Sequence, residues 1–397
     1  MNNKDNQPLL SCTKIFIISY SDYLKYRYLK KIIISVTNDL VSDQRVHRTA
    51  FSLSEAGMEV LLIGRVLYNS LPLPERQYKM HRLRVPFKRG FLFYKSYNIW
   101  LFFFLLFRKT DALLSNDLDT LPANFLISKI KSVPLIFDSH ELFTEVPELI
   151  HRPQVKKIWA LLERFLIPKI NFGITVCDSI AEIYKKNYKI EFAVVRNLPF
   201  RFEMNVQAKK YFDKNKKIIL YQGSLNIGRG IELVIDAMNY LENILFVIAG
   251  EGDISQQLRE RANQPAIKRK IIFLGRIPLN ELHKYTHQAD LGISLEENLG
   301  LNYFYALPNK LFDYIQAEVP VLTSDFPEMS AIVKKYNIGY STNEREPKRL
   351  AFLINQILSN KILLNNWKDN LKIASKDLCW ENEKEKLLLV FNKAGLI

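Results

Sequence analysis

The chain has few cysteines and no long apolar run. Its three cysteines, Cys12, Cys177 and Cys379, are odd in number and far apart, which excludes a disulfide framework and zinc-type spacing and favours a reducing compartment. The strongest apolar run, Ile99–Phe107, has nine residues, well below the roughly 20 that cross a bilayer as a helix. Because the N-terminal stretch Met1–Leu10 is polar, we expect no secretory signal. We therefore predict a cytoplasmic protein that is soluble or peripheral on the inner membrane face.

Acidic residues are also in short supply. The 397 residues include 41 acidic and 56 basic side chains, a net charge of +15, which predicts an anionic partner. Arg76–Lys95 holds seven basic residues and no acid, interleaved with aromatics, a pattern that suits anionic lipid or single-stranded nucleic acid. The plainer interpretation is a solvated basic loop followed by a core helix at Ile99–Phe107. Since nothing else resembles a nucleic-acid-binding motif, we expect an anionic membrane surface rather than nucleic acid.

Alternating strand and helix patterns predict two α/β domains, as the length also suggests. Lys31–Val36 is expected as a buried strand, Arg45–Glu55 as a helix and Val60–Ile63 as a second strand. A second series begins with the strand Ile218–Gln222. We predict an N-terminal extension of unknown role (1–30), a first Rossmann-like domain (31–199), a linker (200–217), a second Rossmann-like domain (218–375) and a C-terminal helix (376–397).

Polar residues follow two neighbouring predicted strands of the first domain, and such strand ends line the ligand crevice of parallel sheets. The side chains concerned are Asp117, Asp119, Asp138, His140 and Glu141. His140 is the best candidate among the six histidines because it ends a strand beside acids, although a lone histidine is more often a packed bystander. The loop Thr37–Gln44 has no GxGxxG, which disfavours a dinucleotide oxidoreductase, and we expect Asp43 to cap the following helix.

Glycine-rich turns follow several strands of the second domain. Gly223–Gly230, GSLNIGRG, leads into a helix, where glycines let the backbone approach a phosphate and Arg229 can bind it through two hydrogen bonds. Alone this is a weak signal, because glycines are common in loops. Similar turns follow later strands, so the candidates for nucleotide binding in these turns are Gly223, Ser224, Arg229, Gly250, Arg276 and Glu296.

The stretch Ala306–Asp325 carries the remaining candidates. Asn309 is predicted as the N-cap of a helix over Lys310–Ala317. Lys310 in the first turn can neutralise a phosphate at the positive helix end, and Asp313 can accept hydrogen bonds from ribose hydroxyls. The alternative is a solvated helix face with a weak ion pair. The neighbouring glycine turns favour the nucleotide site.

The order of these motifs resembles the GT-B glycosyltransferases of family 4, the group 1 nucleotide-sugar transferases. The resemblance spans nearly all of Lys31–Ile397. It implies two doubly wound domains facing across a cleft, with the C-terminal helix crossing back to the first domain. The best-matched stretches are Tyr221–Met238, Phe246–Asp253, Phe273–Leu282 and Leu307–Ser324; Val36–Arg48, Ser115–Ala123 and Asp138–Leu149 look like transferases of bacterial surface-polysaccharide pathways.

The resemblance also implies roles for single residues. The family's diphosphate clamp of an arginine and a lysine falls at Ser224 and Arg229, and Lys310 is the candidate for the missing cation. The family's paired glutamates fall at Tyr305 and Asp313, with Glu296 or Glu297 as a substitute for the first. His140 looks like the histidine that reaches the donor sugar from the first domain. Asp117, Asp119, Asp138 and Glu141 would then lie on the acceptor side.

The expected activity is retaining, metal-independent transfer of a hexosyl or N-acetylhexosaminyl group from a nucleoside-diphosphate sugar, without a cofactor. The acceptor is expected to be a glycan or a lipid-linked saccharide in lipopolysaccharide or capsule synthesis. Asp117 and Asp119 have the spacing of a metal-binding DxD pair, but they lie in the wrong domain for the nucleotide. Two alternatives stay open: a sugar-nucleotide epimerase on the same fold, and a non-catalytic nucleotide- or glycan-binding relative, suggested by Ser224 and Tyr305.

Overall fold

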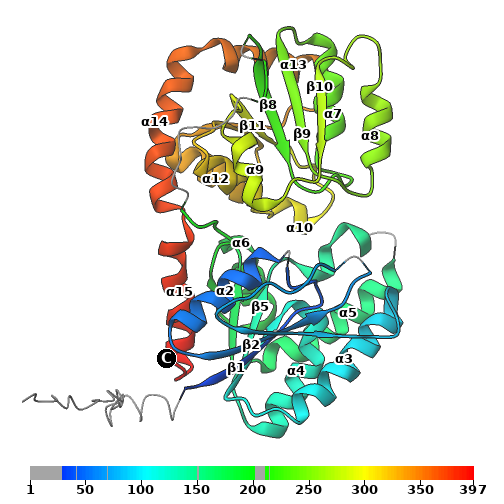
Figure 1. Cartoon of the computed structure of the whole chain (residues 1–397), viewed down its shortest axis with the longest axis vertical. Helices are drawn as coiled ribbons and strands as arrows, with labels where there is room; N and C mark the ends of the chain where they lie inside the picture. The colour runs from blue at the N-terminus through cyan, green and yellow to red at the C-terminus, as the bar shows by residue number, and fades with distance from the viewer. Residues whose placement is uncertain (1–28, 42, 69, 150–151, 202–210, 214) are drawn as a thin grey trace, which may run out of the picture.

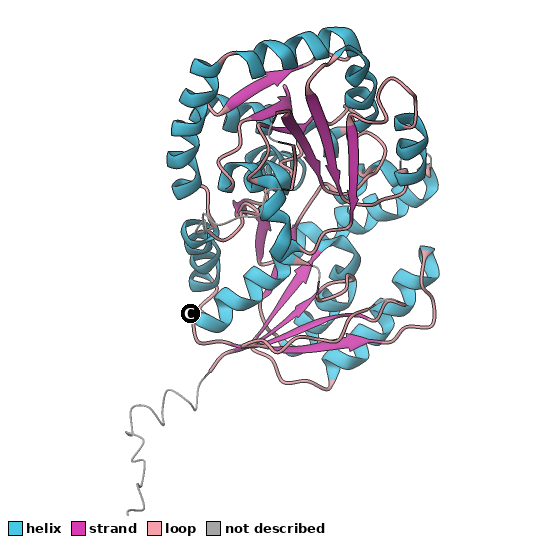
Figure 2. Cartoon of the chain, turned by 45° about the horizontal axis from the view of Figure 1, so that its top comes forward, coloured by secondary structure: helices cyan, strands magenta, loops and turns pink. Residues whose placement is uncertain are grey.

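The computed structural model describes residues 29–41, 43–68, 70–149, 152–201, 211–213 and 215–397. The strand-like piece of the predicted N-terminal extension and much of the predicted linker lie outside these residues. The described chain forms two parallel α/β units, each built on its own sheet (Figure 1 and Figure 2). The predicted fold class of two Rossmann-like domains is confirmed. The exact domain boundaries stay a prediction.

The first sheet has seven parallel strands in the order β3-β2-β1-β4-β5-β6-β7. Its strands are short apolar runs whose successive side chains point to opposite faces, so that Ile33 enters one core and Ile32 and Ile34 enter another. The strands are β1 (Lys31–Ser35), β2 (Glu59–Arg65), β3 (Lys79–Leu83), β4 (Ala112–Asn116), β5 (Leu135–Ser139), β6 (Phe172–Thr175) and β7 (Phe192–Val194).

Helices cover both faces of this sheet. The core of Ile33 includes side chains of four helices, α3 (Gly90–Leu106), α4 (Asp117–Lys131), α5 (Pro153–Leu166) and α6 (Asp178–Tyr188). The opposite core contains α2 (Gln44–Glu55), which begins at Asp43. The Asp43 side chain accepts a hydrogen bond from the Val46 N–H at 3.2 Å, so the predicted cap is confirmed. Short 3-10 turns occupy η1 (Phe143–Glu145), η2 (Pro147–Leu149) and η3 (Ile167–Lys169).

The second sheet has six parallel strands in the order β10-β9-β8-β11-β12-β13. The chain adds β9 and β10 on one side of β8 and then adds β11 to β13 on the other side. Doubly wound sheets bind ligands at such a switch point, which here lies between β8 and β11. The strands are β8 (Lys217–Gln222), β9 (Ile244–Ala249), β10 (Ile271–Gly275), β11 (Leu291–Ser294), β12 (Val321–Ser324) and β13 (Gly339–Thr342). The helices are α7 (Ile231–Ala237), η4 (Met238–Tyr240), α8 (Ser255–Ala262), α9 (Leu279–Thr286), α10 (Leu301–Phe304), α11 (Asn309–Gln316), α12 (Pro327–Tyr336), α13 (Pro347–Ser359) and α14 (Lys361–Asp377).

The last helix, α15 (Trp380–Lys393), returns to the first domain and lies beside α2 (Figure 1). Trp380 is fully buried there, and its indole N–H donates to Ser52 Oγ at 2.9 Å. Its backbone N–H donates to the Pro199 carbonyl at 2.7 Å. The predicted crossing of the C-terminal helix is therefore confirmed, and it ties the two domains together. The predicted boundary between residues 375 and 376 falls in the last turn of α14.

Two predictions about the first domain are confirmed only in part. Five of the seven basic residues of Arg76–Lys95 are exposed, as expected: Lys79, Arg84, Lys88, Arg89 and Lys95. The predicted basic loop contains strand β3, and its Arg82 forms an ion pair with Asp39 at 2.8 Å, with side chains only 11% and 10% exposed. The run Ile99–Phe107 is not all core: Leu101 is buried, whereas Phe107 is 82% exposed. The reason is that a helix on a sheet buries one stripe, while this run is apolar on every side.

The predicted cap of α11 is also wrong. The capping position is Pro308, and Asn309 is the first helical residue. The Asn309 side chain instead accepts a hydrogen bond from Asn197 Nδ2 at 2.8 Å. Asn197 lies at the end of the first domain. The Asn309 side-chain oxygen therefore accepts a hydrogen bond from the other domain instead of capping the N-terminus of α11.

Candidate functional site

A charged cluster lies where β8 and β11 end in the second domain. Lys310 Nζ is 2.5 Å from Glu296 Oε1, and Arg229 Nη1 is 3.9 Å from the same oxygen. The Glu296 side chain is fully buried, that of Lys310 is 7% exposed and that of Arg229 is 24% exposed. Two cations therefore share one carboxylate, and the cluster keeps a net charge of about plus one. Arg229 is its most accessible member.

Neighbouring strands hold Glu296 in this position. Ser294 Oγ donates to Glu296 Oε2 at 2.8 Å. Arg345 donates to the Glu296 carbonyl at 2.7 Å and to Ser324 Oγ at 2.8 Å, so the backbone of the loop is fixed as well. Burial would raise the pKa of Glu296, but Lys310 and Arg229 outweigh it and hold the pKa below its ordinary value. Glu296 is therefore ionised and paired at neutral pH.

The glycine turns bring the backbone close to this cluster. A Cβ on Gly250 would lie 1.9 Å from the Gly223 carbonyl oxygen, so the turns after β8 and β9 touch through their backbones. Gly223 has φ +131° and faces Lys310, whose Cε would lie 3.6 Å from a Cβ at that position. The Ser224 carbonyl accepts a hydrogen bond from Tyr221 Oη at 2.8 Å. A side chain at either glycine would be strained and would narrow the approach to Lys310.

Asp313 lies further along α11, in contact with the end of β8. Gln222 Nε2 donates to Asp313 Oδ2 at 2.9 Å, and Gln222 Oε1 accepts from Thr286 Oγ1 at 2.7 Å. Burial raises the pKa of Asp313 to about 6, although Arg48 of the first domain and Gln222 act in the opposite direction. Asp313 is thus a partly exposed carboxylate that changes charge near physiological pH.

A second charged cluster lies at the ends of β4 and β5 in the first domain. His140 Nδ1 is 3.3 Å from Asp117 Oδ2, and His140 Nε2 is 3.3 Å from Asp138 Oδ2 and 3.1 Å from Asn116 Oδ1. Arg45 binds Asp138 through two hydrogen bonds of 3.0 and 2.6 Å. Burial would lower the pKa of His140, but Asp117 and Asp138 raise it to about 9. At neutral pH His140 is an imidazolium that can donate a proton or a hydrogen bond but cannot accept one.

Asp119 lies behind this cluster. Its Oδ2 accepts a hydrogen bond of 2.5 Å from Thr37 Oγ1, and its buried Oδ1 has no hydrogen-bond partner within the described part of the chain. Burial and the nearby Asp117 raise the pKa of Asp119 to about 7. Asp119 is 6% exposed, so it supports the cluster from within the protein.

Two consecutive residues of α10 connect the clusters. Asn302 Nδ2 donates to Glu141 Oε2 at 3.0 Å, and Asn302 Oδ1 accepts from the Leu142 N–H at 3.1 Å. The next residue, Tyr303, lies with its ring 4.6 Å from the Arg229 guanidinium carbon. Glu141 follows His140 directly, so the sequence-predicted residues of both domains meet around α10. Tyr305, at the position where the family resemblance implies a glutamate, instead packs against Phe304, with ring centroids 5.1 Å apart.

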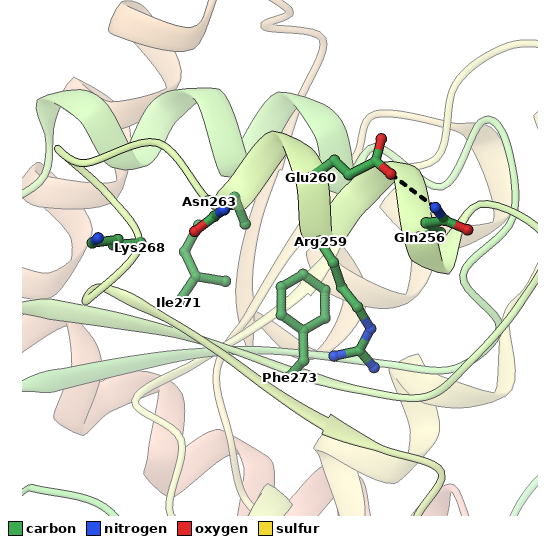
Figure 3. A pocket seen from close by; sticks show the side chains of 8 residues that line it. Gln256, Arg259, Glu260, Asn263, Lys268, Ile271 and Phe273 are labelled. Carbon is green, nitrogen blue, oxygen red and sulfur yellow. Dashed lines mark hydrogen bonds between the residues drawn. The ribbon is translucent and has the colours of Figure 1, made fainter.

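Not every predicted residue joins these clusters. Arg276 follows β10, which is separated from β8 by β9, and its side chain is exposed. A separate hollow of about 430 Å³ lies between α8 and β10, and the residues lining it include Arg259 and Phe273 (Figure 3). Arg259 lies over the Phe273 ring at 4.7 Å and pairs with Glu251 at 2.6 Å. None of the predicted site residues lines this hollow.

The described residues contain no group of three or more histidine, cysteine, aspartate or glutamate side chains that could hold a metal ion. Likewise, no helix in the described part of the chain combines the length and apolar character needed to cross a membrane.

Four residues that shape the site were not predicted from the sequence. Arg45 and Gln222 hold Asp138 and Asp313, and Arg345 fixes the loop of Glu296. Arg48 donates to Asn197 Oδ1, which places a first-domain cation near Asp313. Helical spacing predicts only that Arg45 and Arg48 share one side of α2; their burial depends on contacts with segments far away in sequence.

Comparisons with known proteins find similar sequences and similar folds. Residues 203–373 match the family described as "Glycosyl transferases group 1". The chain is 24% identical over 354 residues, 86% of this chain and 90% of the relative, to the GalNAc-alpha-(1->4)-GalNAc-alpha-(1->3)-diNAcBac-PP-undecaprenol alpha-1,4-N-acetyl-D-galactosaminyltransferase of Campylobacter jejuni. It is 23% identical over 317 residues, 72% of this chain and 68% of the relative, to the chitobiosyldiphosphodolichol beta-mannosyltransferase of Candida albicans.

A solved structure, Anabaena HepE in complex with UDP-glucose, superposes with a TM-score of 0.68 at 12% identity, covering 91% of this chain and 99% of that one. This likeness shows the fold, and the family match covers the domain that carries Arg229, Lys310 and Asp313. The chain therefore has the GT-B fold, and its residues 203–373 match the family of group 1 glycosyl transferases.

Proposed function

We propose that the chain transfers a hexosyl or N-acetylhexosaminyl group from a nucleoside-diphosphate sugar to a glycan or lipid-linked saccharide, with retention of anomeric configuration and without a metal or cofactor. The observation that carries this proposal is the cation-rich cluster of Arg229, Lys310 and Glu296 beside Asp313, at the strand ends where nucleotides bind in this fold.

The donor diphosphate would lie against Arg229 and the Gly223 turn. Arg229 is partly exposed and its Nη1 is 3.9 Å from Glu296, so its guanidinium can rotate toward a phosphate. Lys310 would remain paired with Glu296 and would add to the positive potential at the phosphate. The carboxylate of Asp313 would accept hydrogen bonds from the ribose hydroxyls. In support, the Anabaena structure of the same fold holds UDP-glucose.

In the reaction, the bond between the sugar C1 and the diphosphate oxygen breaks while the acceptor oxygen bonds to C1. The electron pair of the broken bond stays on the diphosphate, where Arg229 and Lys310 stabilise the growing charge. The acceptor proton passes to a diphosphate oxygen, so the step needs no protein base. His140 is an imidazolium whose two ring N–H groups face Asp117 and Asp138, so it would donate a hydrogen bond to a hydroxyl of the donor sugar in exchange for one of these partners.

For the acceptor, we propose a lipid-linked saccharide of surface-polysaccharide synthesis. In support, the names of both relatives describe saccharides joined through a diphosphate to a polyprenol or dolichol. Those names specify an alpha product for one relative and a beta product for the other. The names of the relatives therefore do not test the proposed retention of anomeric configuration. NMR of the product's anomeric proton would measure it directly. Activity that persists with a chelator would support metal independence.

The decisive experiment is to incubate the chain with a panel of radiolabelled sugar nucleotides and a bacterial lipid extract. Transfer of label into the lipid fraction supports the proposal. Conversion of the free sugar nucleotide into its epimer would replace it with the epimerase alternative. Binding of a sugar nucleotide without turnover would favour a non-catalytic relative, and no binding to any member of the panel would overturn the nucleotide site.

A further inference from the structure

Three adjacent helices of the first domain expose large apolar side chains on the side that faces away from the sheet. We name this surface the outer helix face, and within it α4 contacts both α3 and α5. Its members are exposed by between 53% (Trp100) and 82% (Phe107). They are Trp100, Phe103 and Phe107 from α3 and its C-terminal end, Ile130 from α4, and Leu161 and Phe165 from α5.

Packing within the chain does not explain these side chains. α3 already buries Phe93, Tyr97 and Leu101 against the sheet, which is all that a helix in this position needs. Large apolar side chains exposed together on adjacent helices are typical of an interaction surface. The outer helix face is therefore a surface that another body covers.

Charge indicates what that body is. Within these three described helices the acidic residues are Asp117 and Asp119, which belong to the site, and Glu163, which is 8% exposed and accepts from Tyr188 Oη at 2.6 Å. Crossover helices run opposite to the strands. The C-terminal ends of the three helices therefore lie at the same end of the sheet, where its strands begin. Basic residues gather at those ends: Arg108, Lys109, Lys129, Lys131 and Lys169.

Several of these cations lie on aromatic rings beside the apolar residues. Lys169 Nζ is 3.1 Å from the centre of the Phe165 ring, and Lys129 Nζ is 5.4 Å from that of Phe125. The Arg108 guanidinium carbon is 4.9 Å from the centre of the Phe104 ring. Each pair places an apolar body beside a positive head, the combination found where side chains enter the interface of an anionic bilayer.

We propose that the outer helix face docks on an anionic lipid bilayer. A second copy of the chain is a poorer fit, because a two-fold interface would bring the same cations together without exposed carboxylates from these helices to pair them. This inference rests on the proposed function in one respect: a lipid-linked acceptor is held in the membrane, and docking through the sides of these helices leaves the strand ends with His140 uncovered.

The docking surface differs from the one expected from sequence. Arg82, counted there among exposed cations, is used internally in the ion pair with Asp39. Trp100, Phe103 and Phe107, expected as core within Ile99–Phe107, are each more than half exposed. The membrane contact therefore combines apolar insertion with charge, and substitutions in the Arg76–Lys95 segment alone would leave most of it intact.

The test is co-sedimentation of the full chain with phosphatidylcholine vesicles, with and without phosphatidylglycerol. The apolar variant carries Trp100→Ser, Phe103→Ser and Leu161→Ser, and the charge variant carries Lys109→Glu, Lys129→Glu and Lys169→Glu. Matched controls from the second domain carry Phe352→Ser, Ile362→Ser and Ile373→Ser, whose side chains are 65%, 85% and 66% exposed, or Lys348→Glu, Lys361→Glu and Lys368→Glu.

We expect the wild type to bind vesicles with phosphatidylglycerol, and binding to weaken as salt rises. The charge variant should lose at least about tenfold in partitioning, because it reverses three charges that are attracted to anionic lipid. The apolar variant should lose at least about tenfold, because it removes three side chains that enter the bilayer interface, and the controls should match the wild type. Unchanged thermal unfolding of every variant verifies folding. Equal sedimentation of all proteins, or a concentration-dependent dimer that only the apolar variant abolishes, would overturn the proposal. Vesicle binding without sugar transfer would keep it and reject the proposed function.

Discussion

The two charged clusters sit at equivalent places in the two domains, at the carboxyl ends of neighbouring central strands, yet they differ in charge. In the first domain Arg45 and His140 face Asp138 and Asp117, so two cations balance two carboxylates. In the second domain Lys310 and Arg229 share the single carboxylate of Glu296. The first cluster is neutral overall and the second keeps a positive charge.

This difference matches the two halves of a nucleotide-sugar donor. A diphosphate carries negative charge and favours the cluster with spare positive charge, whereas sugar hydroxyls are neutral and need donors and acceptors fixed in place. Under the proposed function the same strand-end position would serve two chemical purposes, because α/β folds place different side chains on equivalent loops. Four substitutions test this contrast.

The largest effect is expected for Lys310→Ala. It leaves the buried carboxylate of Glu296 without its closest cation, so the free energy of unfolding should fall by about 3–5 kcal/mol in chemical denaturation. Adding Glu296→Gln should restore much of the loss, because no unpaired charge then remains buried. Lys334→Ala is the exposed control: Lys334 is 72% exposed in its pair with Asp325, and the loss should stay below about 1 kcal/mol. Unchanged stability of Lys310→Ala would mean that the pair does not persist in solution.

Arg229→Ala should affect catalysis more than folding. Arg229→Ala removes a donor to the developing charge of the diphosphate. The transition state should lose about 2–4 kcal/mol of stabilisation, and kcat/KM should fall accordingly. Stability should change little, because Arg229 is partly exposed and 3.9 Å from Glu296. Steady-state kinetics and thermal unfolding measure the two effects. Arg276→Ala is the informative comparison: an equal or larger loss there would move the diphosphate toward β10.

His140→Gln tests the first cluster through pH. The folded protein raises the pKa of His140 from 6.5 to about 9, so its stabilisation is fully present below pH 6.5 and is lost as pH rises through 9. The free energy of unfolding should therefore fall by up to about 3 kcal/mol across this window in the wild type, and His140→Gln should remove that slope. His47→Gln should retain it, since the pKa of His47 is lowered to about 4. Identical slopes in wild type and His140→Gln would reject the charged imidazole.

The smallest effect is expected for Asp313→Asn. Loss of a charged acceptor for ribose should weaken binding of a sugar nucleotide by about 1.5–3 kcal/mol in calorimetry. Because the pKa of Asp313 is about 6, wild-type affinity should also fall as pH drops through 6, and the variant should lack this dependence. Asp290→Asn, at the opposite end of β11, should bind normally. Unchanged affinity of Asp313→Asn would leave Asp313 with a structural role only.

Local sequence patterns were enough to predict the series of strands and helices, the two-domain fold, the strand-end position of His140 and the helix that carries Lys310 and Asp313. These follow from local patterns of apolar spacing and turn residues, which each segment carries within itself. The prediction that Ile99–Phe107 is all core was wrong because a local pattern shows that a run is apolar, but not which of its sides another segment will cover, as Trp100 and Leu101 illustrate.

The pairing of the charges depends on the tertiary structure and could not be predicted from local sequence patterns. Arg45 and Asp138 are 93 residues apart, and Asp313 is held by Gln222, 91 residues away. Burial makes these pairings obligatory, because a charge removed from water is stable only beside a partner, and partners are supplied by whichever strand ends the sheet brings together. For the same reason the net charge of each cluster, neutral in the first domain and positive in the second, follows from which strand ends are neighbours in the sheet.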